Sequence, residues 1–200
     1  MEFLKMAAII VAAYLLGSLN SAIIVSRLML GVDIRNYGSG NAGSTNAFRT
    51  MGGKKALIVM GGDILKGVAA VAIGAWLAGD MGKLVAGVFV VVGHVFPLYF
   101  GFKGGKGVAC SAAVVFFVDP LWGAVAIVAC LAVIALTRFI SLGSMTMLFC
   151  YMVLMCIAHW GQWAVCLFTV VLFAMCVWRH RSNIHRLLSG TENRIGQKAK

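Results

Sequence analysis

The sequence predicts an all-α integral membrane protein with about seven transmembrane helices. Hydrophobic residues make up 62% of the 200 residues and charged residues only 12%, whereas soluble domains carry roughly 25% charged residues. The apolar residues also fall into runs near the roughly twenty residues that a helix needs to cross a bilayer. Because no repeat, low-complexity tract or soluble linker divides these runs, we expect residues 1–200 to form a single polytopic domain.

Three spans are expected in the first half of the chain, at about residues 3–28, 55–79 and 82–100. The apolar stretch behind Lys5 resembles the core of a signal peptide, but no clear small-residue cleavage motif follows it. We therefore interpret this stretch as an anchor that remains as the first span.

Four further spans are expected between Gly107 and Trp178, the first of them short, at about residues 107–118. A broken helix of that kind is tolerated in a membrane where it lines a cavity walled by protein. Asp followed by Pro is typical of a helix start. Arg138 and His159 are interpreted as lying at outer breaks, and neither is given a role. The breaks that separate these spans are Asp119-Pro120, Arg138 to Ser141, and His159 to Gln162.

The basic residues predict the orientation. They gather in loop 27–55, around Lys103 and Lys106, and in the tail from Arg179. The positive-inside rule places all three segments in the cytoplasm, with the N-terminus outside and the C-terminus cytoplasmic. An odd number of spans is then required, so seven is preferred, five is the alternative and six is excluded.

Charge and cysteine content limit the classes of function. The formal net charge is +11, which in so apolar a chain indicates a cytoplasmic membrane surface and anionic ligands, and no nucleic acid. Five of the six cysteines lie inside apolar runs and are interpreted as small buried hydrophobic residues. No His, Cys and carboxylate cluster has metal-binding spacing, so neither a metal nor a cofactor is expected.

Three polar, basic, glycine-rich patches interrupt the apolar runs, and the first comprises residues 38–49. Its glycines allow backbone N–H groups to turn toward an anion. Ser39 adds a hydroxyl donor, and Arg49 offers a planar fork suited to phosphate. The alternative is an ordinary glycine-rich turn between helices. The predicted substrate-binding residues of this patch are Gly40, Asn41, Thr45 and Asn46.

The second patch comprises residues 94–107, from His94 to the run Gly104-Gly105-Lys106-Gly107. Glycines before an apolar helix resemble a phosphate-binding loop, with backbone donors at a helix N-terminus and Lys106 as a point charge. The loop is not a Walker A motif, because Gly107 stands where Ser or Thr is required, so nucleotide hydrolysis is not supported. The alternative is a turn with a snorkelling lysine.

The third patch comprises residues 179–183 and precedes a charged tail. His180 and Asn183 would share a face if the last helix continued past Trp178. A positive stop after the last span is the alternative for the arginines of this patch. Glu192 is the acid of the tail and is expected to pair with a neighbouring arginine.

Two ionisable residues lie inside the second expected span. Asp63 and Lys66 are three residues apart and can form an ion pair on one helix face. Because charge inside a membrane is costly, such a pair indicates a functional or structural cavity. We assign Lys66 to substrate binding and Asp63 to a structural role.

The first patch, the segment Gly61 to Gly67, the second patch and the segment Arg179 to Gly196 together resemble the bacterial acyl-phosphate:glycerol-3-phosphate acyltransferase (PlsY) family, in order and over essentially the whole chain. The resemblance implies transfer of an acyl group from acyl phosphate to the 1-hydroxyl of sn-glycerol 3-phosphate. The products are lysophosphatidic acid and inorganic phosphate, in the first step of phospholipid biosynthesis. It also implies a bacterial inner-membrane protein with its active site facing the cytoplasm, and the enzyme that makes acyl phosphate as a candidate partner.

The resemblance also implies roles for single residues. Ser39 and Arg49 would be the essential pair of the first motif, Lys106 the charge of the second-motif phosphate loop, and His180 and Asn183 the contacts to glycerol 3-phosphate. Thr45 and Asn46 would line the phosphates, Gly104 to Gly107 would form the loop, and Glu192 would support the architecture.

Two questions stay open at the level of sequence. The proton acceptor is either His180 or a phosphate oxygen of a substrate, and a covalent acyl group on Ser39 is disfavoured because no base adjoins it in sequence. The competing class of protein is a membrane transporter for a small phosphorylated metabolite. A small membrane scaffold is the third possibility.

Overall fold

The computed structural model describes residues 2–196, and within that range every regular element is a helix. The chain forms two compact units, an N-terminal unit that ends at Val114 and a C-terminal unit that begins at Val115. The elements of the N-terminal unit are α1 (Glu2–Ser18), α2 (Ser21–Leu30), η1 (Ile34–Asn36), α3 (Ser44–Met51), α4 (Gly53–Val95) and η2 (Leu98–Phe100). α5 (Val108–Val118) crosses the boundary, and α6 (Pro120–Thr137), α7 (Ile140–Ala158), α8 (Trp163–Arg179) and α9 (Arg181–Leu188) follow.

The first expected span is an apolar helical segment with a polar break. α1 and α2 together form a 29-residue apolar segment, interrupted at Asn20. The Asn20 side chain caps α2 by accepting a hydrogen bond from the Ile23 N–H at 3.1 Å, which satisfies one of the donors that a helix start leaves unpaired. The break therefore turns a polar side chain inward, together with the carbonyls of Gly17 and Leu19, which accept hydrogen bonds from Lys66.

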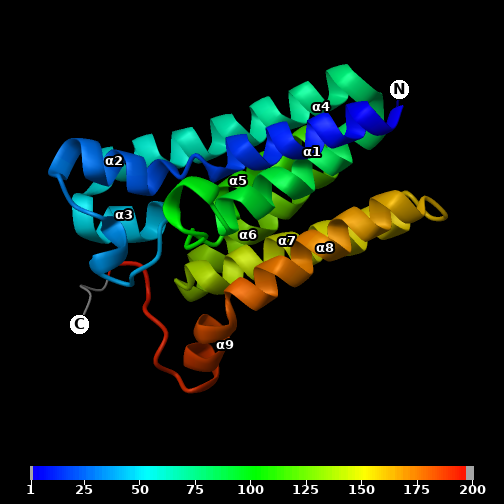
Figure 1. Cartoon of the computed structure of the whole chain (residues 1–200). Coiled ribbons are helices and arrows are strands. Elements are labelled where there is room, and N and C mark those ends of the chain that lie inside the picture. Colours follow the sequence, from blue (N-terminus) through cyan, green and yellow to red (C-terminus); the bar gives the residue numbers. More distant parts are fainter. Residues whose placement is uncertain (1, 197–200) are drawn as a thin grey trace. The chain divides into compact units, whose positions relative to one another are not determined.

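α4 consists of two helical arms, residues 53–77 and 80–95, joined at Ala78 and Gly79 (Figure 1). Gly79 has φ 57°, a left-handed conformation that favours glycine. A Cβ on Gly74 would overlap the carbonyl of Gly82, so the second arm turns back along the first. Two helical arms thus lie where the spans 55–79 and 82–100 were expected, the second arm ending at Val95; that each arm crosses the membrane by itself stays a prediction.

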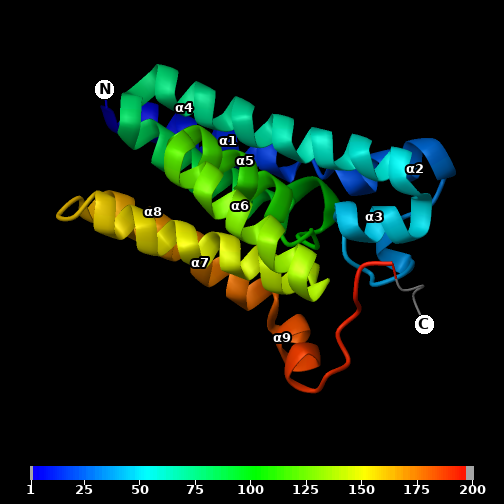
Figure 2. The same cartoon turned by 180° about the vertical axis from the view of Figure 1, so that it is seen from behind.

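Close backbone packing joins α1 to the second arm of α4 (Figure 2). A Cβ on Gly17 would overlap the Val90 carbonyl, and one on Gly93 would overlap the Tyr14 carbonyl. Small residues of this kind let helices approach closely where lipid removes the usual hydrophobic drive for association. The Tyr14 hydroxyl then donates to the Phe96 carbonyl at 2.9 Å and fixes the end of the second arm.

The C-terminal unit begins its first full helix as the sequence predicts. The Asp119 side chain accepts from the Trp122 N–H at 3.0 Å, and Pro120 occupies the first helical position of α6. α6, α7 and α8 pack in succession (Figure 1). Arg138, Phe139 and the stretch from His159 to Gln162 separate these helices, which confirms the breaks expected there.

One expectation about the C-terminal unit is corrected. The last helix does not continue straight past Trp178, because α8 ends at Arg179 and α9 bends away by 61°. The Ile195 N–H donates to the Arg138 carbonyl at 2.9 Å, so Arg138 lies beside the tail. An outer break at Arg138 and a cytoplasmic tail are therefore two predictions that exclude each other.

Four segments of the described chain are long and apolar enough to cross a membrane. The bent pair α8 and α9 adds a fifth candidate, and α5 is a shorter apolar helix of 11 residues. The second segment holds both arms of α4. The number of seven spans, the outside N-terminus and the single domain stay predictions. The four segments are Glu2–Leu30, Gly53–Phe100, Pro120–Thr137 and Ile140–Ala158.

Candidate functional site

The first patch is a turn whose shape is held by Asn46. The buried Asn46 amide oxygen accepts from the Ser39 N–H at 2.9 Å, and its nitrogen donates to the carbonyls of Tyr37 (3.0 Å) and Ile34 (3.3 Å). Gly38 has φ 59° and packs so tightly that a Cβ would overlap the Asn46 side chain. Asn46 was predicted to bind substrate, whereas in the structure its side-chain amide holds the turn.

Beyond this turn, the first patch presents donors at the start of α3. The helix begins at Ser44, so the first-turn N–H groups, including that of Thr45, have no partner within the helix. Arg49 follows on the same helix, and within residues 2–196 its guanidinium has no ion pair or hydrogen bond. Ser39 and Gly40 are exposed and Asn41 is half-buried. These groups are available to an anion.

The second patch is tied by its backbone to the end of α4. The Gly104 N–H donates to the Val95 carbonyl at 3.1 Å, and the Gly105 N–H donates to the His94 carbonyl at 3.3 Å. These two N–H groups are therefore not the phosphate donors that the sequence predicts. The remaining candidates for phosphate donors in this patch are Lys106, Gly107 and the N–H groups in the first turn of α5.

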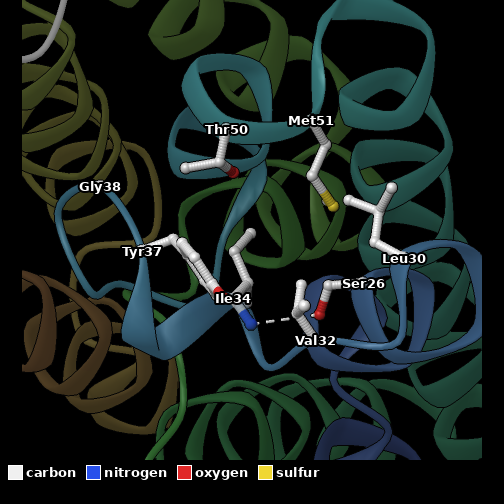
Figure 3. Close-up of a pocket in the computed structure, with 8 residues that line it drawn as sticks. All are labelled: Ser26, Leu30, Val32, Ile34, Tyr37, Gly38, Thr50 and Met51. Atoms are coloured by element: carbon white, nitrogen blue, oxygen red, sulfur yellow. Dashed lines mark hydrogen bonds between the residues drawn. The ribbon is translucent and has the colours of Figure 1, made fainter.

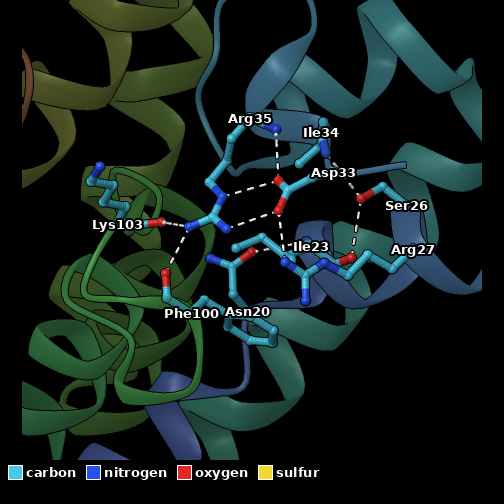
Figure 4. Close-up of polar contacts among 9 residues, drawn as sticks. All are labelled: Asn20, Ile23, Ser26, Arg27, Asp33, Ile34, Arg35, Phe100 and Lys103. Atoms are coloured by element: carbon cyan, nitrogen blue, oxygen red, sulfur yellow. Dashed lines mark hydrogen bonds and ion pairs between the residues drawn. The ribbon is translucent and has the colours of Figure 1, made fainter. Parts of the chain in front are cut away.

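Arg35 lies in η1, the segment that leads into the first patch, and its side chain bonds to the second patch (Figure 4). Its Nη1 donates to the Phe100 carbonyl at 2.7 Å and the Lys103 carbonyl at 3.1 Å. The same guanidinium holds Asp33 through two parallel bonds, Nε to Oδ1 at 2.9 Å and Nη2 to Oδ2 at 2.8 Å. Such bidentate pairs fix geometry as well as charge. Arg27 also donates to Asp33 at 2.8 Å.

The sequence interpretation missed the contacts of Arg35, because this residue was counted only as one positive charge of loop 27–55. Its hydrogen bonds to Asp33 lower the pKa of that carboxyl well below its usual range, with the Arg27 contact adding to them. The hydrogen bond to Asp33 in turn raises the pKa of Arg35. The spacing Asp33-x-Arg35 is a weak local signal, and nothing in it points to Phe100 and Lys103.

A buried polar cluster lies beneath the two patches, formed by Ser21, Asp63, Lys66 and His94. The predicted ion pair is confirmed, with Lys66 Nζ 2.9 Å from Asp63 Oδ1. The Ser21 hydroxyl donates to the same oxygen at 3.0 Å. Lys66 also donates to the Leu19 carbonyl at 2.9 Å and the Gly17 carbonyl at 3.1 Å. With these partners its ammonium is committed inside the protein, which argues against the predicted substrate-binding role.

The third patch lies in the C-terminal unit, where α8 bends into α9. His180 is buried, and its Nδ1 lies 2.8 Å from the Cys176 carbonyl. Because that carbonyl can only accept, Nδ1 carries the proton and Nε2 of the neutral ring is the acceptor. The Asn183 side chain donates to Glu192 at 2.6 Å.

Glu192 gathers three donors from two helices of the C-terminal unit, α7 and α9. Besides Asn183, the Ser141 hydroxyl donates to Oε1 at 2.8 Å and Arg186 Nε donates to Oε2 at 2.8 Å. The expected pairing with a neighbouring arginine is thus confirmed. Burial raises the pKa of Glu192, but the hydrogen bonds from Asn183, Ser141 and Arg186 outweigh burial and leave the pKa below its usual value.

A cavity of about 340 Å³ lies behind the first patch, between α2, η1 and α3 (Figure 3). Tyr37, Met51 and Leu30 give it a largely apolar wall, and Gly38 is the member of the first patch that lines it. Its lining includes none of the predicted site residues, so it is distinct from the anion-binding groups. Among the described residues, no group of three His, Cys, Asp or Glu side chains is placed to hold a metal ion.

Known proteins resemble this chain over most of its length. A family model described as glycerol-3-phosphate acyltransferase matches residues 7–190. A glycerol-3-phosphate acyltransferase of Thermoanaerobacter sp. (strain X514) is 46% identical over 188 residues, which cover 94% of each protein. Its counterpart in Bacillus subtilis (strain 168) is 41% identical over 189 residues, covering 94% of this chain and 97% of the relative.

Solved structures agree with this relationship. The crystal structure of PlsY, an integral membrane glycerol 3-phosphate acyltransferase, in its glycerol 3-phosphate form has a TM-score of 0.89 and 37% identity, with 96% of each chain covered. The lysophosphatidic acid form has a TM-score of 0.86 and 33% identity, covering 96% of this chain and 95% of the other. With its apolar helices, this chain is a multi-pass membrane protein, and it belongs to the glycerol-3-phosphate acyltransferase family.

Proposed function

We propose that the protein transfers an acyl group from acyl phosphate to the 1-hydroxyl of sn-glycerol 3-phosphate, giving lysophosphatidic acid and inorganic phosphate. The family supports the acyltransferase activity, and a solved relative is described in its glycerol 3-phosphate form. The observation that carries the proposal is that two basic, glycine-rich patches lie together within one unit: Gly105 of the second lies against the Ala42 carbonyl of the first, and Arg35, just before the first patch, holds the carbonyls of Phe100 and Lys103. Two patches suit a reaction in which both substrates carry phosphate.

The chemistry follows from the donor. The glycerol oxygen attacks the acyl carbonyl carbon, the bond from that carbon to the phosphate oxygen breaks, and the phosphate leaves with the bonding electrons. The hydroxyl proton passes to a phosphate oxygen or to His180, whose Nε2 is the acceptor nitrogen. Because the anhydride is already activated, the protein has mainly to orient the hydroxyl and neutralise negative charge.

The residues fall into three groups in this proposal. Ser39 and Arg49 bind and polarise the donor from the first patch, together with Gly40, Asn41 and Thr45. Lys106 and Gly107 bind phosphate from the second patch. His180 and Asn183 recognise glycerol 3-phosphate, with Glu192 holding Asn183 at 2.6 Å.

The setting in the cell is also proposed. Seven spans, with the three basic patches on the cytoplasmic side of a bacterial inner membrane, agree with the distribution of Lys and Arg. Acyl phosphate would then reach the site from the membrane, and the enzyme that makes it is a candidate partner. The whole chain would act as one domain.

A phosphate-release assay tests the reaction. Purified protein in detergent or lipid mesophase receives palmitoyl phosphate and glycerol 3-phosphate, and Arg49→Ala, Lys106→Ala and His180→Ala run beside the parent. We expect release that depends on glycerol 3-phosphate and falls by about a hundredfold in Arg49→Ala, because a fixed cation stabilises the developing charge.

Lys54→Ala is the matched control, since Lys54 is an exposed basic residue in the first turn of α4, close in sequence to Arg49. It should keep activity within about twofold, as a rim charge does. If the folded parent released no phosphate with acyl phosphate, acyl-CoA or acyl carrier protein as donor, the proposal would be wrong. Flux of phosphorylated metabolites into liposomes would then be measured.

A further inference from the structure

His94 lies where the buried cluster meets both phosphate-binding patches. Its ring is 2% exposed at the end of the second arm of α4. On one side, Nδ1 lies 2.9 Å from Lys66 Nζ and 3.4 Å from Asp63 Oδ1. On the other side, Nε2 lies against Gly105 of the second patch. The ring therefore connects an ion pair inside the membrane span to a loop that carries Lys106.

The cluster holds the His94 ring through Nδ1. This atom faces two groups of opposite character: it can accept from the Lys66 ammonium at 2.9 Å or donate to the Asp63 carboxylate at 3.4 Å. In either case Nε2 is the atom that faces Gly105. Lys66 is itself fixed by the carbonyls of Gly17 and Leu19 at the α1–α2 break. The orientation of the ring is thus held from behind by Asp63 and Lys66, and through Lys66 by the end of α1.

Gly105 is enclosed between the His94 ring and the first patch. A Cβ at this position would overlap both His94 Nε2 and the carbonyl oxygen of Ala42. The Gly105 N–H is bound to the His94 carbonyl at 3.3 Å, and the Ala42 carbonyl accepts from the Asn20 side chain at 3.4 Å. The backbone of the second patch therefore has no room to move toward either neighbour.

We propose that His94 is a positioning residue, whose ring, held by Lys66 and Asp63, sets how closely Gly105 and Lys106 approach the first patch. The interpretation rests on the proposed function, in which the two patches bind substrate phosphate. His94 touches neither substrate nor reacting atoms in this account. It acts by keeping Lys106 at one distance from the groups around Ala42, where a displacement of about 1 Å is costly.

Two substitutions distinguish a positioning role of His94 from a merely structural role, in which the ring is only a buried polar group. Asn at residue 94 places an oxygen where Nδ1 lies and keeps the acceptor for Lys66, but it leaves the space beside Gly105 empty. Gln extends to the place of Nε2 and refills that space, but it presents the Lys66 contact poorly. A merely structural His94 would be replaced better by Asn, whereas a positioning His94 is replaced better by Gln.

The experiment measures KM for palmitoyl phosphate and kcat for His94→Asn and His94→Gln, using only protein that is monodisperse and retains cooperative thermal unfolding. We expect KM to rise about tenfold in His94→Asn with kcat within about threefold, because binding common to ground and transition state is lost. His94→Gln should keep KM within about threefold of the parent. The opposite ranking, or equal KM values in both variants and the parent, would overturn the proposal.

A double-mutant cycle of His94→Asn with Gly105→Ala provides a second readout. The added methyl group meets both the His94 ring and the Ala42 carbonyl. Because Asn at residue 94 relieves the first of these overlaps, the effect of Gly105→Ala on KM should shrink about threefold, which is the non-additivity expected of residues in contact. Additive effects would argue against the contact. Lys106→Ala shows whether a negative result concerns the proposed function or the positioning role. If Lys106→Ala leaves KM unchanged, the assignment of the loop to phosphate binding is wrong. If Lys106→Ala raises KM while His94→Asn does not, only the positioning role of His94 is wrong.

Discussion

Asp63 and Glu192 each gather donors from segments that are distant in sequence, and they do so in opposite surroundings. Asp63 lies inside the apolar span of α4 and binds Ser21 and Lys66, with side-chain exposures of 2% for Asp63 and 5% for Lys66. Glu192 lies in the tail beyond α9 and binds Arg186, whose side chain is 38% exposed. The first carboxylate has a counter-charge that water does not reach, and the second has a counter-charge that water does reach.

The difference predicts how each cluster responds to loss of one member. A buried charge that loses its counter-charge is left uncompensated, which costs more than the intact pair contributes. A half-exposed arginine that loses its carboxylate is hydrated instead. A single substitution in the cluster of the span should therefore cause a large loss of stability, whereas a single substitution in the cluster of the tail should cause a smaller loss.

The largest effect is expected for Asp63→Asn. The substitution leaves the Lys66 ammonium buried without its carboxylate, at a cost of about 3–5 kcal/mol, and thermal unfolding in detergent should show a lower Tm and poor yield. Asp63→Asn combined with Lys66→Met removes both charges and should recover a large part of the Tm. If the double variant is no more stable than the single one, the pair is not the source of the loss.

A smaller effect is expected for Glu192→Gln, at about 1.5–3 kcal/mol, since a charged acceptor of three hydrogen bonds becomes neutral. The folded-state pKa of Glu192 is lowered, so its contribution is present above the unfolded pKa of about 4.3 and is lost as pH falls through the folded value. The variant should be less stable than the parent at pH 7 and should lose less on acidification.

Denaturation curves at pH 7 and at about pH 4 would check this prediction. Arg186→Gln is the control, because it removes the exposed partner and leaves the contacts from Ser141 and Asn183. It should cost less than Glu192→Gln at pH 7. Equal loss of stability on acidification in parent and Glu192→Gln would show that other carboxyl groups, such as Asp33, dominate the acid response.

The smallest effect concerns the pair Asp119 and His159, whose side chains lie 3.4 Å apart and are partly exposed. Asp119 also caps α6. Asp119→Ser keeps a capping oxygen and should change stability by less than about 0.5 kcal/mol, whereas Asp119→Ala loses the cap and should cost about 1 kcal/mol. Comparable Tm values for the two variants would assign the effect to the His159 contact.

Features that depend on neighbouring residues were predicted well from sequence. The cap at Asp119 and the ion pair of Asp63 with Lys66 follow from spacings of one to three residues, and the structure confirms both. The helix breaks likewise follow from short polar interruptions in apolar runs. Local chemistry decides these features, so a single sequence carries enough information.

Features that depend on distant pairing were missed or misjudged. Nothing in the sequence indicates that Arg35 reaches Phe100, or that the N–H groups of Gly104 and Gly105 are used by the end of α4. Asn46 was expected to bind substrate because amides bind phosphate, but its surroundings commit it to the turn. A donor's availability depends on what folding places beside it, which spacing does not show.

The shortness of α5 bears on which nucleophile the acyl group meets. Eleven residues make a helix about 16 Å long, roughly half the hydrocarbon thickness of a bilayer. If the far end of α5 reaches one membrane face, the loop before it lies well below the opposite headgroup level. Water is scarce at that depth, so hydrolysis of a reactive anhydride competes poorly with attack by a bound glycerol hydroxyl. In the proposed reaction, the short helix thereby favours acyl transfer to glycerol 3-phosphate over hydrolysis of the acyl phosphate.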